Sequence, residues 1–466
     1  MRTTAHAVLA ILSLPILCCG QSTLNFPRVM QPGDFKTSGF AVVNPDSTVA
    51  TVTFTLYGTD GDSQATTTET IPARGQLARL ASELFPEAAA AGWTQATSGS
   101  GGLQGFWFGG DLATFADGAE AAPSSTELIL PLITPQSEIH ITNTGSADAI
   151  LLLNLLGTDG FDLALPFPQR IAAKGFFRAD TAFLFPTISD FSVPSHMRIT
   201  CKCANPGSFA ATVIARDFIA RPSWAVINGV PAATTSTAVY FPHLVEGPQA
   251  SANWRSLLGL TNLSASSPNN VAITFVSESG EIVRTNVRTL PRNGALRFAV
   301  RDLFGLTSGF QNGSVRVTST SGLPLTGYIA SADLVAAGVA VVPAQQDADA
   351  NLLFAHIADL PPWLTGIALL NTNTDAANVE VFAMNPNGSL IGNTSFSLEG
   401  NASIARLLRD LVPQTQTRTS DGGFVFVRSS LPIYGIELFF SRNLQMLGNV
   451  PPGRVAAGIE FVPPSP

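Results

Sequence analysis

The sequence is poor in lysine and in charge of either sign. Of its 466 residues only 12% are charged, and lysine occurs only at Lys36, Lys174 and Lys202. Acidic residues outnumber basic ones by 33 to 25, which gives a formal net charge of −8 at pH 7. A protein that binds nucleic acid needs clustered basic side chains to neutralise phosphates. We therefore expect no nucleic-acid partner.

Long apolar runs are also missing from the sequence. The longest ones, residues 149–157 and 334–343, are far shorter than the ~20 residues that a transmembrane helix requires. We expect no membrane span. Because 45% of the residues are hydrophobic, the chain has enough apolar side chains to fold into compact units.

The first 20 residues have the features of an export signal. Arg2 precedes an apolar segment, and Cys18, Cys19 and Gly20 follow it. Cleavage after Gly20 fits the small-residue rule and predicts a secreted or cell-surface protein that begins at Gln21. The alternatives are a lipid anchor on Cys19 and a buried N-terminal helix.

Cysteine is scarce after this segment, since only Cys201 and Cys203 follow it. Alternation along a strand would put both side chains on one face. A bridge across one intervening residue would be strained, and a metal site would need further ligands. Free or mutually oxidised thiols, intermolecular pairing and metal binding all stay open as alternatives.

Signatures of catalysis are equally sparse. Nucleophilic catalysis needs a base beside the nucleophile, and the exported part offers four histidines, His140, His196, His243 and His356. No hydrolase, zinc-protease or phosphate-loop motif is present. We therefore predict no catalytic, cofactor-binding or metal-binding residues and expect a protein that is not an enzyme. His243 and His356 each follow the first strand of a repeat, which favours a packing role over metal binding.

The chain does contain four copies of one pattern. In each copy an apolar run ends in asparagine, at Asn44, Asn143, Asn262 and Asn371. A turn glycine follows each asparagine 17 or 18 residues later, at Gly61, Gly160, Gly280 and Gly388. Asp-Gly and Asn-Gly pairs are strong hairpin signals, and asparagine closes a strand by bonding to nearby backbone. We interpret the asparagines as structural.

The spacing of strands and turns indicates the fold class. Six or seven short strands in each copy, separated by turn residues, predict an antiparallel β-sandwich with one helical turn. A four-bladed propeller would need only ~40 residues per repeat. Small, polar connectors predict short linkers and separable units. The predicted organisation is a signal peptide at 1–20 and repeats at 21–126, 127–237, 238–350 and 351–466.

These features resemble a poorly characterised immunoglobulin-like repeat that occurs in tandem in exported bacterial proteins. The resemblance rests on residues 240–243, the strand 365–371, the Asn387-Gly388 hairpin and the strand at 314–317. It covers essentially the exported chain and is weakest in the second repeat, where Glu138 and His140 interrupt the apolar run. The family carries no catalytic residues, so the resemblance implies a surface or extracellular scaffold.

Two function classes follow. The first is an exported, non-enzymatic scaffold or adhesion protein, with a surface polysaccharide or cell-surface protein as partner. The second is an exported carbohydrate-active enzyme or polysaccharide-binding accessory protein. Trp254 and Trp363 precede the asparagine-ending strands of consecutive repeats. Their matching positions favour a shared exposed loop in which they contact the ligand, and packing in the core is the alternative.

Overall fold

The computed structural model describes residues 21–188, 195–202, 209–219, 222–307, 309–418, 422–455 and 461. The predicted export signal, with Cys18 and Cys19, and the later Cys203 lie outside the described residues. Strands make up 58% of the structure and helices 6%. The predicted all-β class is confirmed.

The first two repeats follow the same order of strands. Repeat 1 contains β1 (Ser22–Met30), η1 (Pro32–Lys36), β2 (Gly39–Val43), β3 (Ala50–Tyr57), β4 (Ser63–Ile71), β5 (Gln76–Leu80), α1 (Ala81–Leu84), β6 (Gly92–Ser98), β7 (Gln104–Gly110) and β8 (Ala116–Glu120). Repeat 2 contains β9 (Glu127–Ile133), β10 (Glu138–Asn143), β11 (Ala149–Leu156), β12 (Phe167–Ile171), β13 (Phe176–Asp180), α2 (Thr181–Leu184), β14 (Ser195–Cys201), β15 (Phe209–Arg216), β16 (Trp224–Asn228) and β17 (Val230–Pro231).

The last two repeats keep this order but contain longer strands. Repeat 3 contains β18 (Ala238–Gln249), β19 (Ala252–Asn262), β20 (Asn269–Ser277), β21 (Ile282–Leu290), β22 (Ala295–Ala299), α3 (Val300–Phe304), β23 (Gln311–Ser319), β24 (Leu325–Asp333) and β25 (Val339–Pro343). Repeat 4 contains β26 (Asp349–Phe354), β27 (Trp363–Leu370), β28 (Ala377–Met384), β29 (Leu390–Leu398), β30 (Ser403–Leu407), α4 (Leu408–Leu411), η2 (Pro413–Thr417), β31 (Phe424–Ser441), β32 (Leu447–Val450) and β33 (Gly453–Arg454).

Each repeat forms two antiparallel sheets. In repeat 1 the first sheet has the order β1-β6-β3-β4 and the second the order β5-β2-β7-β8. The other repeats use the equivalent pairings; β18 also pairs with β19, and the long β31 takes part in both sheets of repeat 4. Alternate residues of β3 (Val52, Phe54 and Leu56) are fully buried, as expected for strands with one face on a core.

The recurring asparagines are structural, as predicted. Asn371 is fully buried, and its Nδ2 donates to the carbonyl oxygens of Asp375 at 2.8 Å, Leu398 at 2.9 Å and Glu399 at 3.1 Å. Its Oδ1 accepts a hydrogen bond from the backbone N–H of Asn373 at 3.0 Å. Asn44, Asn143 and Asn262 make equivalent bonds. One side chain therefore ties the strand end to the two turns beside it.

The turn glycines have left-handed backbone conformations, which confirms the predicted hairpins. Their φ values are +84° at Gly61, +79° at Gly160, +88° at Gly280 and +83° at Gly388. Each turn also lies against the following repeat. A Cβ on Gly388 would come within 2.8 Å of the carbonyl oxygens of Ala73 and Arg74 in repeat 1. Glycine is needed at this position both for backbone conformation and for close packing between repeats 4 and 1.

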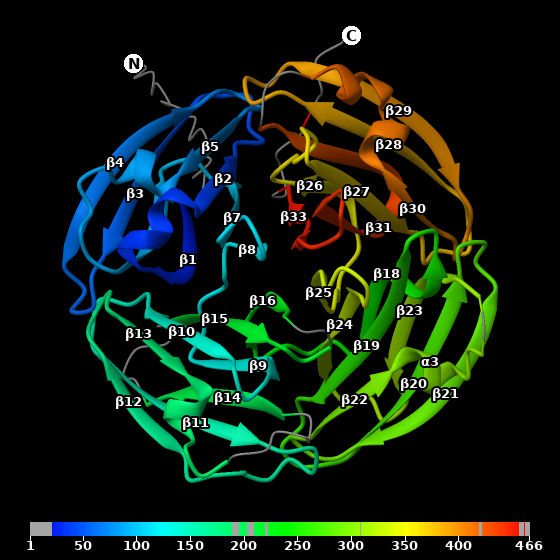
Figure 1. Cartoon of the computed structure of the whole chain (residues 1–466), viewed down its shortest axis with the longest axis horizontal. Helices are drawn as coiled ribbons and strands as arrows, with labels where there is room; N and C mark the ends of the chain where they lie inside the picture. Colours follow the sequence, from blue (N-terminus) through cyan, green and yellow to red (C-terminus); the bar gives the residue numbers. More distant parts are fainter. Residues whose placement is uncertain are drawn as a thin grey trace, which may run out of the picture.

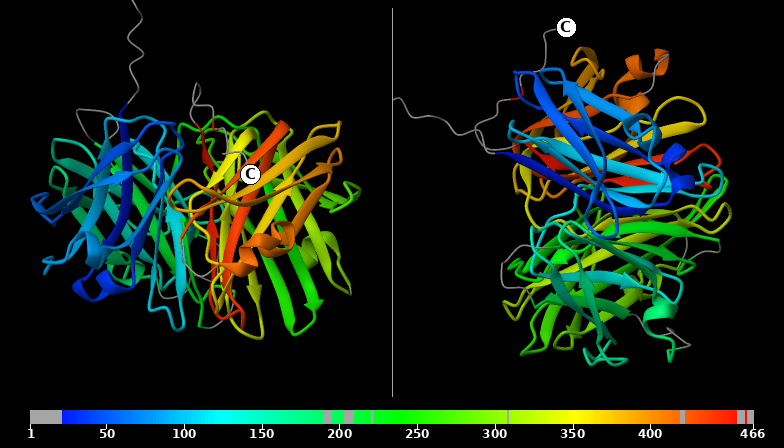
Figure 2. Two further views of the ribbon diagram at one scale, coloured as in Figure 1. Left: turned by 90° about the horizontal axis from the view of Figure 1, so that it is seen from above. Right: turned by 90° about the vertical axis from the view of Figure 1, so that its left-hand side faces the viewer.

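The four repeats close into a ring (Figure 1). Seen from its edge, the ring is a disc whose strands run steeply from one face towards the other (Figure 2). The apolar cores continue across the boundaries: Ile214 and Val226 of repeat 2 join the core of repeat 1. Val43, Phe106 and Ala116 of repeat 1 join the core of repeat 4. The polar connectors did not predict this sharing, because it arises between the sheets.

A buried glutamine closes the ring between its last and first repeats. The Nε2 of Gln76 donates to the carbonyl oxygens of Ala355 at 2.6 Å and Gly423 at 2.7 Å, and its Oε1 accepts from the N–H of Gly423 at 2.7 Å. The backbone N–H of Gln76 donates to the carbonyl of Pro386 at 2.8 Å. These bonds satisfy every group of a side chain that is removed from water.

The last strands of the second sheets surround the ring axis. β8 is in contact with β16 and β32, and β25 with the same two strands (Figure 1). Asp117 in β8 accepts backbone N–H bonds from Val226 of repeat 2 at 2.6 Å and from Asn449 of repeat 4 at 3.3 Å. Burial raises the pKa of Asp117 to about 8, although these N–H groups favour the carboxylate. Asp117 therefore connects three repeats around the axis.

Candidate functional site

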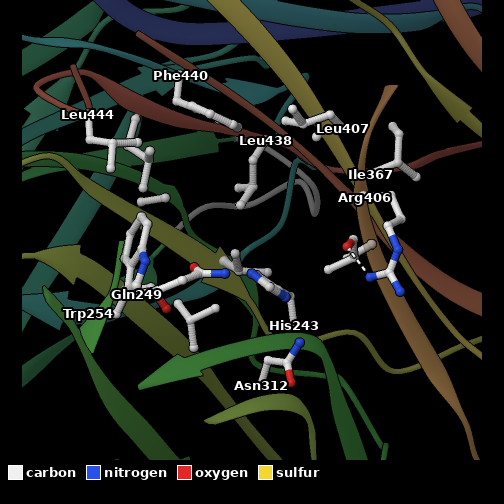
Figure 3. Close-up of a pocket in the computed structure, with 18 of the residues that line it drawn as sticks. His243, Gln249, Trp254, Asn312, Ile367, Arg406, Leu407, Leu438, Phe440 and Leu444 are labelled. Carbon is white, nitrogen blue, oxygen red and sulfur yellow. Dashed lines mark hydrogen bonds between the residues drawn. The ribbon is translucent and has the colours of Figure 1, made fainter. Parts of the chain in front are cut away.

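A cavity of about 250 Å³ lies between repeats 3 and 4, and we call it the 3–4 pocket. Figure 3 shows its labelled side chains converging on one space, with Trp254 and His243 opposite Leu438 and Phe440. Most of the lining is aliphatic or aromatic, and the polar members include Gln249, Asn312, Ser331 and Arg406. An apolar cavity with a few polar groups at a junction between packed units is the usual form of a small-ligand site.

The 3–4 pocket exists because repeat 4 has small residues on the face that meets repeat 3. Gly366 and Ala368 lie in β27, five and three residues before Asn371, and both line the pocket. The corresponding residues of repeat 2, counted back from Asn143, are Glu138 and His140. β18 of repeat 3 packs against β27 and β31. Short side chains on β27 leave part of this junction unfilled.

The polar side chains of the pocket come from both repeats. His243 follows Pro242 in β18, and burial lowers the pKa of His243 to about 4, so its imidazole is neutral near pH 7. Arg406 of β30 donates to Glu278 of repeat 3 at 3.3 Å. Arg406 is therefore held across the junction by an exposed ion pair, and it places one positive charge at the edge of the pocket.

The structure separates the two tryptophans that the sequence paired. Trp254 lies within β19, opposite Gly247 and Asp333 on its neighbouring strands, and lines the 3–4 pocket. Trp363 is the first residue of β27 and packs edge-on against Phe439, with 5.8 Å between ring centroids. Both are partly buried residues of strands. The expected loop placement is wrong, and the expected role in ligand binding stays a prediction.

The contact between repeats 1 and 2, which we call junction 1–2, is filled by a charged cluster. The cluster consists of Arg28, Glu138, His140, Arg178 and Arg216. Glu138 receives bonds from Arg178 at 2.6 Å and Arg216 at 3.0 Å, and its Oε1 lies 2.8 Å from the Nε2 of His140. Burial would raise the pKa of Glu138, but the bonds from His140 and Arg178 hold it well below its ordinary value. Glu138 is therefore a carboxylate.

The remaining members fix the contact with repeat 1. The Nδ1 of His140 accepts from the N–H of Val29 at 3.0 Å, so the proton of a neutral imidazole lies on Nε2, facing Glu138. Burial lowers the pKa of His140 against the opposing effect of Glu138. Arg28 lies 5.4 Å from the ring centroid of Trp107. Glu138 and His140, which interrupt the apolar run of the second repeat, therefore form part of junction 1–2.

His356 is also used in packing. His356 stacks on Phe106 and Phe108 of repeat 1, at centroid distances of 6.3 and 6.1 Å. Burial lowers the pKa of His356 and of His196 to about 4. Cys201 is disulfide-bonded. Within the part of the chain that the structure describes, no three His, Cys, Asp or Glu residues are grouped to hold a metal ion.

Comparisons with known proteins show one match to a family of unknown function and weak similarity to solved structures. Residues 36–165, which span repeat 1 and the start of repeat 2, are similar to a family of unknown function, DUF5719. The curated proteins contain no match to this chain. Solved structures that match include the β-glucuronidase of Bacteroides uniformis and its β-glucuronidase 2 with a covalently bound aziridine. Both are 7% identical, with a TM-score of 0.11, over 52% of this chain and 26% of theirs.

The described residues contain no helix long and apolar enough to cross a membrane.

Sequence analysis identified Trp254 as a candidate ligand-binding residue, and Trp254 lines the 3–4 pocket. It did not identify the residues of repeat 4 on the opposite side of the pocket. Aligning the repeats on their asparagines shows that Gly366 and Ala368 are small where repeat 2 has Glu138 and His140, but repeat 1 has the equally small Gly39 and Ala41. The alignment alone therefore does not locate the cavity, which the structure shows between repeats 3 and 4 among the described residues.

Proposed function

We propose that this chain is an exported, non-enzymatic binding protein, built from four immunoglobulin-like β-sandwich domains that close into a ring. The 3–4 pocket is the observation that carries the proposal. Its volume, about 250 Å³, suits a small molecule or one apolar group of a larger surface partner. Its apolar walls supply the affinity, and the groups at its edge, such as Gln249, Asn312 and Arg406, orient the ligand.

The state of the histidines supports binding over catalysis. A general base works best when its pKa lies near the pH of the reaction. The pKa values of His196, His243 and His356 are lowered to about 4 by burial, and His140 already contacts Glu138 and Val29. None of these imidazoles is poised for proton transfer at neutral pH.

Two features support export. The first 20 residues read as an export signal. Cys201 is disulfide-bonded, and disulfides persist mainly in oxidising compartments outside the cytosol. A role as a polysaccharide accessory is less well supported, because sugar stacking needs an open aromatic face. Trp254 lines a pocket between two repeats and Trp363 packs on Phe439.

The test is binding of N-phenyl-1-naphthylamine, a small apolar dye that becomes fluorescent when it leaves water. We expect saturable binding to the full chain, weakened at least tenfold by Trp254→Ala. Trp363→Ala is the matched control, because it removes the same side chain outside the pocket. It should lower the melting temperature, through loss of the Phe439 contact, and keep dye affinity within twofold. Equal loss in both variants would contradict the proposal.

A further inference from the structure

A second, larger cavity lies on the ring axis, and we call it the axial pocket. It has a volume of about 730 Å³ and is lined by residues from all four repeats. Each repeat contributes a proline near the end of its innermost strand, namely Pro123, Pro231, Pro343 and Pro451. The pocket is therefore a product of ring closure, and no single repeat contains it.

The lining of the axial pocket has an unusual charge balance. It includes the carboxyl groups of Glu120 and Asp347, but no lysine, arginine or histidine lies among the described residues that form it. These described lining residues include no aromatic side chain either. Sugar rings are usually held by stacking on aromatic faces, so this cavity is poorly suited to them. It suits a ligand that is attracted by negative charge.

Two buried amides point to the same ligand chemistry. Asn228 of β16 and Asn449 of β32 line the axial pocket and are only 6% and 3% exposed. The Oδ1 atom of each is buried and has no hydrogen-bond partner among the described residues, although buried acceptors are normally satisfied. The Nδ2 of Asn228 already donates to the backbone carbonyl of Glu120 at 2.9 Å. The two Oδ1 atoms therefore lack hydrogen-bond donors.

Glu120 lies at the centre of this arrangement. Burial raises the pKa of Glu120 above its ordinary value, and hydrogen bonds from its own backbone and Asn228 only partly oppose this. A carboxyl group in such a place lacks a counter-charge. A bound cation would supply the counter-charge, and a rotation of the two buried amides would bring their oxygen atoms within reach of its N–H groups.

We propose that the axial pocket binds an organic cation that carries primary ammonium groups, such as a di- or polyamine. An ammonium group donates three hydrogen bonds and accepts none, which matches a lining of carboxyl and amide oxygens. The site shares only Val342 with the lining of the 3–4 pocket, and it goes beyond the function proposed above. Either site can exist without the other, so the two tests fail independently.

The experiment is calorimetric titration of the full chain with spermidine at moderate ionic strength. We expect one spermidine per chain, with affinity reduced at least tenfold by Glu120→Gln and also reduced by Asp347→Asn. Glu120→Gln keeps the size of the side chain and should not destabilise the fold, because burial already favours the uncharged form. Glu87→Gln is the control, since Glu87 is an exposed carboxylate of the same repeat.

Affinity in the Glu87→Gln variant should stay within twofold of the parent protein. Equal losses in the Glu87 and Glu120 variants would show that spermidine is attracted only by the net negative charge, and this would overturn the proposal. Titrations with glucose and with calcium chloride complete the test. Binding of either one that depends on Glu120, without binding of spermidine, would also overturn the proposal.

Discussion

Junctions 1–2 and 3–4 are built from equivalent strands but fill the space between repeats in different ways. In both, the first strand of one repeat crosses the second sheet of the next, β1 over β10 and β15, and β18 over β27 and β31. The residue after the Phe-Pro pair is Arg28 in β1 and His243 in β18. Junction 1–2 is closed by hydrogen-bonded charges, whereas junction 3–4 retains a cavity.

The other two junctions show that cavities are not inherent to the architecture. In repeat 3 the small residue is Gly259, and a Cβ there would meet the ring of Tyr328 at 2.3 Å. At junction 4–1, Phe106 and Phe108 stack on His356. An aromatic ring thus replaces the missing side chain in both cases. In repeat 4 the residues paired with Gly366 and Ala368 are Leu438 and Ile436, and the Phe440 ring would lie 3.4 Å from a Cβ on Gly366, which leaves room for a ligand.

The largest effect is expected where junction 1–2 is broken. Glu138→Ala removes the carboxylate that Arg178 and Arg216 share. The carboxylate is buried but the two arginine side chains are about one-third exposed, so we expect a loss of about 3 kcal/mol in the free energy of unfolding, at the lower end of the range for a broken buried pair, measured by urea denaturation. Glu380→Ala is the matched control, since its pairing with Arg428 is on the surface and should contribute about 1 kcal/mol or less. Equal losses would mean that the cluster is not a structural junction.

Junction 3–4 should be the more sensitive one to acid through His243. Its folded pKa, about 4, is below the ordinary value of 6.5, so the unfolded chain takes up a proton first as the pH falls. The stability that neutral His243 contributes is complete above pH 6.5 and is lost between pH 6.5 and 4. The loss is on the order of 2 kcal/mol after allowance for partial solvent access.

The measurement is the free energy of unfolding of the parent protein and His243→Gln at several pH values. The difference between the two should shrink as the pH falls from 6.5 to 4. His243→Leu, which copies Leu132 of repeat 2, should flatten the pH dependence in the same way. Parallel curves for all three proteins would show that His243 is not buried as a neutral group.

Local features of this fold could be predicted from the sequence, but the junctions could not. Asn371 and Gly388 act within a few residues of their own positions in the chain, through turn bonds and a required φ. Trp254 was found because it recurs relative to Asn262, yet β19 begins at Ala252, earlier than the apolar run alone indicates. Its placement in a loop failed for this reason.

The 3–4 pocket and the ring depend on side chains that meet only after folding. Gly366 of repeat 4 lies beside free space, and its equivalent in repeat 1 is Gly39. A Cβ on Gly39 would meet the ring of Phe108 at 2.8 Å. The same residue type therefore means free space in one repeat and close packing in the other. No pattern within a single repeat distinguishes these cases, because the deciding volume belongs to its partners.

The smallest effect on stability, and the sharpest on ligand binding, is expected from Gly366→Leu, which gives repeat 4 the residue that repeat 3 has at Leu257. A Cβ on Gly366 would find the Phe440 ring at 3.4 Å and otherwise only carbonyl oxygens at 3.8 and 3.9 Å, so the added side chain can extend into the cavity. Filling it should change the free energy of unfolding by about 1 kcal/mol or less.

The same substitution should abolish binding of N-phenyl-1-naphthylamine, and Gly366→Ala, which occupies less of the cavity, should weaken it to an intermediate degree. Spermidine binding in the axial pocket should be unchanged in both variants, since Gly366 lines the 3–4 pocket and does not line the axial pocket. A leucine that destabilises the protein strongly would show that junction 3–4 is already packed. Junctions 1–2 and 3–4 would then differ only in the polarity of the side chains that fill them, and not in the presence of a cavity.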